Sequence, residues 1–235
     1  MAVDPKSTTQ VAAGGKAPPV CPCCGGTRFG PGPGGRMSRR GRPPTCLQCG
    51  SLERHRAGRQ LIDTIRDRAA FKEFSLLDFG DIRVVAGGWF RSIETSAFGS
   101  PGAIDPQAID RPDGSYGFII CYHVLTRVPD HRKALGELTR ILSPDGLLVL
   151  AYPSPATRAE TTDWGAPDPK QHGSYRILGR DFEPELSVCT AGAHVLAVKA
   201  VDPVTADDDL VYIVTKDFRW VRRILATKVE VRLLD

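Results

Sequence analysis

The sequence DPQAIDRPDGSYGFIICYHVLTRVPDHRKALGELTRILSPDGLLVL, residues 105–150, decides the fold of this chain. Residues 118–121 are a short apolar run, the pattern of a strand that is buried on both faces of a parallel sheet. Asp130 can cap a following helix in which apolar residues recur at helical spacing. The turn formers at residues 143–146 are expected to end that helix before a second buried strand begins at residue 147. Two parallel strands joined by a helix predict a right-handed crossover and an open α/β sheet.

Length and composition describe an ordinary globular chain with an uneven distribution of charge. Its 235 residues allow one main domain and a small attachment, and 41% are hydrophobic and 25% charged. The apolar runs are too short to span a bilayer and the N-terminus has no apolar signal core, so a cytoplasmic protein without a membrane span is expected. Residues 1–60 hold ten Lys and Arg against two acidic residues, a net charge of +8, whereas the remainder carries −4. A basic head of this kind raises the question of nucleic-acid or acidic ligands.

Two C-x-x-C pairs stand near the N-terminus. Their four cysteines are Cys21, Cys24, Cys46 and Cys49. Each pair can bend through a tight turn that presents two thiolates, and Gly25 and Gly50 directly follow the pairs, where such a turn needs backbone freedom. This spacing predicts a zinc ion bound by the four thiolates in a small ribbon over residues 21–50. The alternatives are free thiols or two disulfides, and a reducing compartment disfavours disulfides. Cys23 could replace Cys24 as a ligand, although the spacing favours Cys24.

The segments around the cysteines have separate interpretations. Residues 1–20 are small, polar and rich in proline, which predicts a disordered tail. Residues 29–44 are rich in Gly, Pro and Arg, and form either a phosphate-contacting loop or a solvated excursion of the ribbon. The scarcity of aromatic residues for base stacking favours the solvated excursion. Ser51 can cap a helix with an apolar face, so residues 51–73 are expected to be a connector helix.

The order of motifs in residues 105–150 resembles that of S-adenosylmethionine-dependent methyltransferases of the seven-stranded class. The shared order is an acidic residue, Pro-Asp-Gly-Ser-aromatic, an apolar strand, His-Val-Leu, a helix and Leu-Ser-Pro-Asp-Gly. The motifs CPxCG, CxxCGSLERHR and RILGRDF are similar to those of bacterial methyltransferase-like proteins that carry an N-terminal zinc ribbon. The resemblance covers most of residues 21–215. It implies a seven-stranded Rossmann-like sheet in residues 74–217, followed by a basic C-terminal segment, 218–235, that docks as a helix.

The resemblance also implies a site for S-adenosylmethionine at the carboxyl ends of the strands. The implied cofactor-binding residues are Asp78, Gly80, Glu94, Asp105, Pro106 and Tyr122. Glu94 would contact the ribose hydroxyls and Asp105 the adenine amino group, unless Asp105 is a loop carboxylate that caps something local. Only Gly80 of the usual glycine-rich turn is retained, and Ile82 adds a branched side chain to it. This departure predicts weaker cofactor binding than a regular glycine loop would give.

Two histidines are the candidate catalytic residues. His123 follows the strand at 118–121, where it could act as a general base or cap the next helix. His172 lies in the long polar segment 151–180, which is expected to be a substrate lid. In the same segment Gln171, Tyr175 and Arg176 could also face a substrate. Further departures from the methyltransferase pattern near the expected reaction centre are Gly117, Thr126, Arg127 and Ser174.

The leading functional hypothesis is methyl transfer from S-adenosylmethionine to an oxygen or nitrogen atom of a small molecule or glycan. Such a transfer requires alignment of the two reactants and sometimes a base, so it leaves no fixed triad in a sequence. One alternative is a catalytically silent methyltransferase-like scaffold that serves a protein partner subunit. Another is an RNA-binding or RNA-modifying protein that uses the basic zinc ribbon.

Overall fold

The computed structural model describes residues 18–80, 84–153, 156–190 and 192–234. It contains a mixed sheet of seven strands in the order β11-β9-β10-β6-β5-β3-β4. The strands are β3 (Ser75–Asp78), β4 (Ser92–Thr95), β5 (Tyr116–Tyr122), β6 (Leu142–Ala151), β9 (His194–Val201), β10 (Asp208–Thr215) and β11 (Val231–Leu233). Four of these, β4, β3, β5 and β6, run parallel, and β10 joins β6 antiparallel. The predicted open α/β sheet is therefore confirmed.

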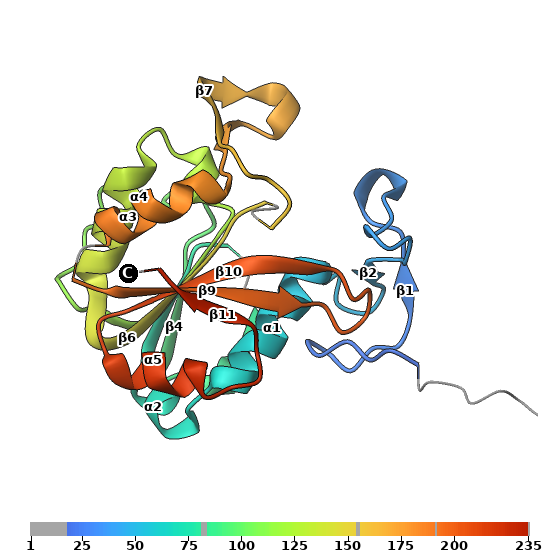
Figure 1. The fold of residues 1–235 in the computed structure, drawn as a ribbon, viewed down its shortest axis with the longest axis horizontal. Helices are drawn as coiled ribbons and strands as arrows, with labels where there is room; N and C mark the ends of the chain where they lie inside the picture. The colour runs from blue at the N-terminus through green and yellow to red at the C-terminus, as the bar shows by residue number, and fades with distance from the viewer. Residues whose placement is uncertain (1–17, 81–83, 154–155, 191, 235) are drawn as a thin grey trace, which may run out of the picture.

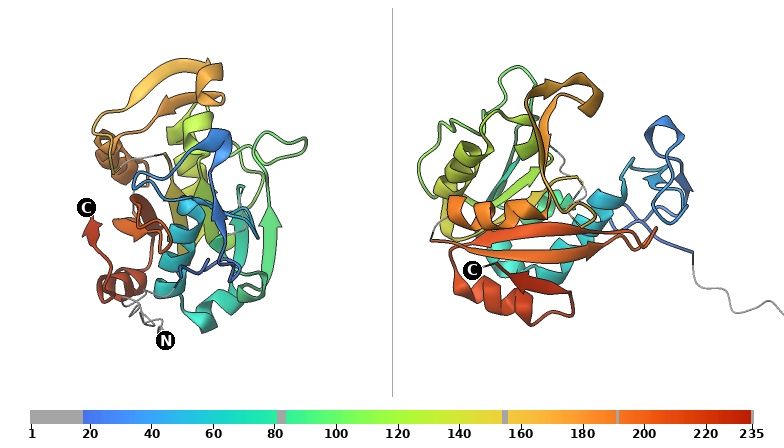
Figure 2. Two further views of the ribbon diagram at one scale, coloured as in Figure 1. Left: turned by 90° about the vertical axis from the view of Figure 1, so that its right-hand side faces the viewer. Right: turned by 45° about the horizontal axis from the view of Figure 1, so that its top comes forward.

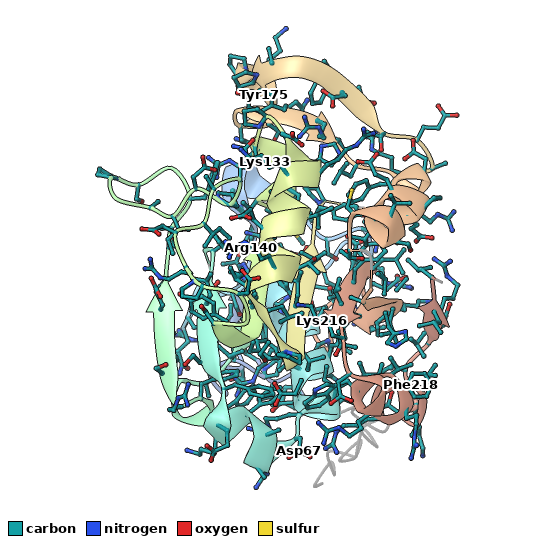
Figure 3. The ribbon with its side chains drawn as sticks, turned by 90° about the vertical axis from the view of Figure 1, so that its left-hand side faces the viewer. Asp67, Lys133, Arg140, Tyr175, Lys216 and Phe218 are labelled. Carbon is teal, nitrogen blue, oxygen red and sulfur yellow. The ribbon has the colours of Figure 1, made fainter. Side chains whose placement is uncertain are left out.

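Helices cover both faces of this sheet (Figure 1). They are α1 (Glu53–Ile65), α2 (Arg68–Glu73), α3 (His131–Ile141), α4 (Glu183–Cys189) and α5 (Phe218–Leu225). One buried cluster joins α1, α2 and α5 to one face of the strands, and a second joins α3 and α4 to the other. Figure 3, seen from the side opposite the N-terminus, shows α3 upright over its face, with Lys133 and Arg140 along it. Among the described residues, no helix is both long and apolar enough to cross a membrane.

The remaining strands form two small antiparallel pairs outside the main sheet. β1 (Phe29–Gly30) pairs with β2 (Thr45–Cys46), and β7 (Thr162–Asp168) pairs with β8 (Ser174–Ile177). Short 3-10 helices are η1 (Pro33–Gly35), η3 (Gly87–Trp89), η4 (Leu125–Arg127), η5 (Pro169–Gln171) and η6 (Arg180–Phe182). The segment 151–180, expected to be a substrate lid, carries its own hairpin, which projects from the sheet at the top of Figure 1.

The chain changes direction across the sheet at β3. From β3 it passes to β4 on one side, and then returns to β5 on the other side of β3. The loops that follow β3 and β5 therefore diverge at the carboxyl ends of these two strands, where open α/β sheets form their ligand crevice. The topology predicts a binding site beside residues 79–80 and 122–123.

The central stretch folds as predicted except at the start of its second strand. Asp130 caps α3, and its carboxylate accepts a hydrogen bond from the Lys133 amide at 2.9 Å. The helix ends at Ile141 and β6 begins at once, so residues 143–146 are not a separate turn. They bulge within the ladder instead, because Tyr116 pairs with Leu142 and Phe118 with Leu147. The turn-forming residues take up this register shift.

The predicted connector helix at residues 51–73 is two helices. α1 ends at Ile65 and α2 begins at Arg68. Asp67 separates them, because its side chain accepts from the amides of Ala69 and Ala70 and starts a new helix. The C-terminal segment contains the expected docked helix, α5, and then β11, which adds to the sheet edge at β9. Of the tail predicted at residues 1–20, residues 1–17 lie outside the described residues.

Residues 18–50, here called the cysteine module, are joined to the sheet through Arg56 of α1. This side chain is fully buried and makes a bidentate ion pair with Asp202, with Nε–Oδ1 and Nη2–Oδ2 distances of 2.8 and 2.6 Å. Its Nη1 also donates to the carbonyls of Pro44 and Ser51 at 2.7 and 2.8 Å. One guanidinium thus connects the module, α1 and the turn that follows β9. Figure 2 shows the module (blue) beside that end of the β9–β10 pair.

The arginine-rich loop of the module also contacts this turn, while its arginine side chains stay exposed to solvent. The Arg39 amide donates to the Asp207 carboxylate at 2.7 Å. Arg40 donates to the Ala206 carbonyl at 2.9 Å, and Arg42 to the Val204 carbonyl at 3.2 Å. The acidic sequence before β10 is complementary in charge to these arginines. The interaction holds the module in a fixed place against the sheet.

Candidate active site

A cavity of about 820 Å³ lies at the carboxyl ends of the parallel strands, where the topology predicts a ligand crevice. Its walls come from the loops after β3, β4, β5 and β6, from the first turn of α1, from the β7–β8 hairpin and from the cysteine module. The volume falls in the upper part of the range of small-molecule sites, about 300–1,000 Å³. The cavity therefore has room for more than one small ligand.

Three of the predicted site residues line the cavity at the ends of β3 and β5. They are Gly80, Tyr122 and His123. Asp78 lies beneath them, fully buried, and its Oδ1 accepts from the Gly80 amide at 3.0 Å, which shapes the turn after β3. A Cβ at Gly80 would meet no described atom within 4 Å, so the backbone is open there. Ile82, the residue behind the expectation of weak binding, lies outside the described residues.

Tyr122 is 6% exposed and packs against α1. A Cβ at Gly58 would lie 2.3 Å from the Tyr122 hydroxyl, so only glycine allows the helix this close to the strand. Burial, with Asp78 nearby, raises the pKa of the Tyr122 phenol. Tyr122 is therefore protonated at neutral pH, and it can contact a ligand but not serve as a base.

His123, which follows β5, and His172, which lies between β7 and β8, both line the cavity. Both have left-handed backbone conformations, with φ of 60° and 56°. Among the described residues, the only other non-glycine residue with positive φ is Ala206, in the turn between β9 and β10. Such conformations cost about 1–3 kcal/mol and gather at functional sites. The two candidate catalytic residues are therefore placed at one cavity, each at a strained position.

The β7–β8 hairpin is fixed over the cavity by Arg176. Its guanidinium is buried, with an ion pair from Nε to Asp163 at 2.7 Å. It also donates to the backbone carbonyls of Val128 and Pro129 at 2.6 and 2.7 Å. Gln171 and Ser174 line the cavity as well, whereas Tyr175 does not and lies on the outer hairpin at the top of Figure 3.

The remaining predicted residues do not line the cavity. Glu94 accepts hydrogen bonds from the Arg111 guanidinium at 2.6 Å and from the Tyr116 hydroxyl. Asp105 is exposed, and its Oδ1 accepts from the amide and the side chain of Gln107 at 2.9 and 3.2 Å. Pro106 is buried beside it. The structure therefore shows the local capping role for the Asp105 carboxylate, while its contact with a cofactor stays a prediction.

Gly117 does not belong to the expected reaction centre. It lies near the start of β5, away from the carboxyl end that meets the cavity. A Cβ at Gly117 would be 2.2 Å from the Phe74 ring, so the ring occupies the space that a side chain would need. This departure from the methyltransferase pattern is a packing feature. Thr126, Arg127 and Ser174, in contrast, do line the cavity.

The first turn of α1 and the module supply walls that the sequence did not predict. Leu52, Arg54 and His55 line the cavity, as do Pro33 and Arg36 of the module. His55 is 2% exposed, and its Nδ1 accepts from the Leu52 amide at 2.9 Å. One feature of the sequence could have indicated these walls: the second cysteine pair is followed directly by the Ser-Leu-Glu-Arg-His-Arg motif, which places the start of α1 beside the module.

The four predicted metal ligands form one cluster in the module. The Sγ atoms of Cys21, Cys24, Cys46 and Cys49 all lie within 4.8 Å of one another. The Cys21–Cys49 and Cys24–Cys46 Sγ distances are 3.8 and 3.6 Å. A tetrahedron with bonds of about 2.3 Å to a central zinc has edges of about 3.8 Å, so the thiols fit such an ion.

The backbone around the cluster repeats the same turn twice. Gly25 donates to the Cys21 carbonyl and Gly50 to the Cys46 carbonyl, both at 2.8 Å. Both glycines have positive φ, 77° and 70°. Cys23 is not part of the cluster.

The methyltransferase-domain family model matches residues 53–180, more than half of the chain, and the chain belongs to this family. The mixed seven-stranded sheet with helices on both faces fits the Rossmann-like fold of class I S-adenosylmethionine-dependent methyltransferases. The cysteine module lies outside the matched residues.

Several solved structures resemble the chain at low identity. A 1,6-didemethyltoxoflavin-N1-methyltransferase of Burkholderia thailandensis, with bound S-adenosylhomocysteine, is 14% identical over 68% of this chain and 77% of that chain, with a TM-score of 0.48. A S-adenosylmethionine-dependent methyltransferase of Thermotoga maritima is 13% identical over 69% and 89%, with a TM-score of 0.43. The [4+2]-cyclase SpnF is 12% identical over 73% and 83%, with a TM-score of 0.42. No curated protein sequence matches the chain.

Proposed function

We propose that this protein transfers the methyl group of S-adenosylmethionine to an oxygen or nitrogen atom of a small molecule or glycan, inside the 820 Å³ cavity. The observation that supports it best is the position of this cavity. The chain belongs to the methyltransferase-domain family, and its cavity opens at the switch point between β3 and β5. The cavity also extends to the β7–β8 hairpin and to α1. One part can therefore hold the cofactor while the other holds an acceptor.

The lining at the strand ends fits the cofactor. Gly80 offers an open backbone, and Phe98, which is partly exposed, offers apolar surface to an adenine. When bound, S-adenosylmethionine would supply a methyl group on a positively charged sulfur. We propose that Glu94 accepts hydrogen bonds from the ribose hydroxyls of the cofactor and that Asp105 accepts one from its adenine amino group. The hydrogen bonds that these carboxylates make to Arg111 and Gln107 would then be shared or exchanged on binding.

The protein's own contribution is alignment, exclusion of water and acceptance of a proton. Arg176 fixes the hairpin over the cavity, and Arg56 fixes α1 and the module beside it. His123 and His172 are the proposed proton acceptors, because both residues line the cavity and histidine is the side chain most often used for proton transfer in catalysis. Alignment supplies most of the acceleration in such a transfer.

The cysteine cluster is proposed to hold one structural zinc ion. Four thiolates close a tetrahedral coordination sphere and leave no position for a substrate. Metal analysis of the purified chain should find about one zinc, and it should be lost from C46S/C49S but kept in C23S, whose thiol is outside the cluster. Retention of zinc by C46S/C49S would contradict the assignment.

A pair of glycine variants tests the cofactor site. Gly80 and Gly88 both have open space at the Cβ position, but only Gly80 lines the cavity. We expect Gly80→Val to bind S-adenosylhomocysteine at least about tenfold more weakly than Gly88→Val, because its side chain occupies the space the cofactor needs. Calorimetric titration measures both affinities. Equal affinities in the two variants would contradict the proposed site, and no binding to the unmodified chain would favour the scaffold alternative.

A further inference from the structure

Ser51 lies between the cysteine cluster and the cavity wall. It follows Cys49 and Gly50 in the sequence and directly precedes Leu52, which lines the cavity. The sequence predicts that its side chain caps α1, but the N-cap position of this helix belongs to Leu52. Ser51 is fully buried, and its hydroxyl contacts the thiols of the cluster instead.

The Ser51 hydroxyl contacts two of the four sulfur atoms. Its Oγ lies 3.2 Å from the Sγ of Cys21 and 3.2 Å from the Sγ of Cys49, so it bridges the two cysteine pairs. Cysteines bind zinc as thiolates, which accept hydrogen bonds but cannot donate them. Around a zinc ion the hydroxyl would therefore donate to one of these two sulfurs. A hydrogen bond of this kind orients the ligands of a metal ion and tunes their basicity.

The backbone of Ser51 is bound from both sides as well. Its carbonyl accepts from the Cys46 amide at 2.9 Å and from Nη1 of Arg56 at 2.8 Å. Arg56 belongs to α1, so Ser51 is attached to the cluster and to the helix at once. A second link runs beside it, because Arg36 of the module makes a bidentate pair with Glu53, the first residue of α1, at 2.8 and 2.9 Å.

The first turn of α1 belongs both to this connection and to the expected cofactor site. Leu52 and His55 line the cavity. One turn further along, Gly58 lies against Tyr122 at the end of β5, and residues three apart on a helix share a face. A ligand at the ends of β3 and β5 therefore borders on the first turn of α1. A shift of that turn would change the wall against which the ligand packs.

From these contacts we infer that Ser51 is a positioning residue that couples the zinc ion of the cysteine cluster to the cofactor part of the cavity. Zinc fixes the two sulfurs, the sulfurs fix Ser51, and Ser51 fixes the start of α1. Zinc and S-adenosylhomocysteine then bind cooperatively, and each raises the affinity for the other by the same factor. This inference goes beyond a zinc ion that only stabilises the module, and it rests on the proposed function.

The test measures the zinc affinity of the full chain by competition with a chromogenic zinc chelator, with and without saturating S-adenosylhomocysteine. In the unmodified chain, S-adenosylhomocysteine should raise the zinc affinity at least about fivefold, the lower end of typical coupling between two sites. Calorimetry should find the same factor between the zinc-loaded and the metal-free chain in their affinity for S-adenosylhomocysteine. Ser51→Ala should lower the zinc affinity by about 10–100-fold, the usual effect of removing a hydrogen bond to a metal ligand. Its coupling should fall below about twofold.

Two further variants separate the hydroxyl from the packing of the module. Ser38→Ala is the matched control, because Ser38 is a second buried serine of the module, and its hydroxyl accepts from the Arg42 amide at 3.0 Å. Ser38→Ala should keep both the zinc affinity and the coupling. Ser51→Thr keeps the hydroxyl and should keep the coupling. If Ser51→Ala does not fold, Ser51→Thr decides: retained coupling supports the role of the hydroxyl, and lost coupling overturns it.

The outcomes also separate this inference from the proposed function. If the unmodified chain binds S-adenosylhomocysteine but its zinc affinity does not change, the coupling is overturned and the methyltransferase proposal stands. The same conclusion follows if the coupling persists in folded Ser51→Ala, or if Ser38→Ala loses it equally. If the unmodified chain does not bind S-adenosylhomocysteine at all, the proposed function fails, and with it the inference.

Discussion

Replacing Arg56 by methionine should both destabilise the protein and release the cysteine module. The substitution leaves the Asp202 carboxylate buried without its cation, and removing one partner of such a pair costs about 3–5 kcal/mol. Asp202 keeps three donors, the amides of Val204 and Thr205 and the Thr205 hydroxyl, which favours the lower end. The Pro44 carbonyl loses its donor, at about 1 kcal/mol, whereas the Ser51 carbonyl keeps the hydrogen bond from the Cys46 amide. We expect a total loss of about 4 kcal/mol.

Urea denaturation of the zinc-loaded protein, followed by circular dichroism, measures this loss. Arg40→Met is the matched control, since that exposed arginine donates to one carbonyl of the same turn and should cost less than about 1 kcal/mol. R56M/D202N should recover part of the loss, because it no longer buries a charge. A loss below about 1 kcal/mol in Arg56→Met, or no recovery in the double variant, would refute the role of the ion pair.

Three further predictions follow from single contacts. Gly58→Ala should destabilise the protein by about 1–2 kcal/mol, because the added methyl group clashes with the Tyr122 hydroxyl. Adding Tyr122→Phe should restore stability. Equal stability of Gly58→Ala and the unmodified chain would contradict the close approach of α1 to β5. Hydrogen bonds from the Tyr116 hydroxyl, and then from Arg111, lower the pKa of Glu94 below 4.5 although burial opposes this shift. The ionised Glu94 therefore stabilises the fold above pH 4.5, and this contribution is lost as the pH falls through the lowered pKa. Glu94→Gln should therefore lose less stability on acidification than the unmodified chain does, and parallel pH curves would refute this. Asp105→Ala should weaken S-adenosylhomocysteine binding, and an unchanged affinity in calorimetry would reject its adenine role.

The central fold was predictable because its signals are local. The apolar run at 118–121, the cap at Asp130 and the helical spacing after it each depend on neighbouring residues, and each is confirmed. The four cysteines were predictable for the same reason, since the two C-x-x-C turns fix their thiols in pairs. The bulge at residues 143–146 was not, because it is decided by pairing with β5, and turn-forming residues look alike in a turn and in a bulge.

The cavity could be predicted only in part, because most of its wall is made by distant segments. Residues at strand ends, such as Gly80 and His123, follow from the sheet topology. Arg36 enters the site only because the module docks on the turn after β9, a contact between segments more than 160 residues apart in the sequence. Likewise, the Phe74 ring that excludes a side chain at Gly117 could not be read from the sequence around residue 117.

The most direct test of the account is a calorimetric titration of the purified, zinc-loaded chain with S-adenosylhomocysteine. We predict one binding site per chain, with a Kd weaker than about 1 µM, or about −8 kcal/mol, because Ile82 replaces the usual glycine in the turn after β3. A Kd of 1 µM or tighter would refute the weak binding while leaving the site in place. Absence of detectable binding at millimolar ligand would contradict the account itself.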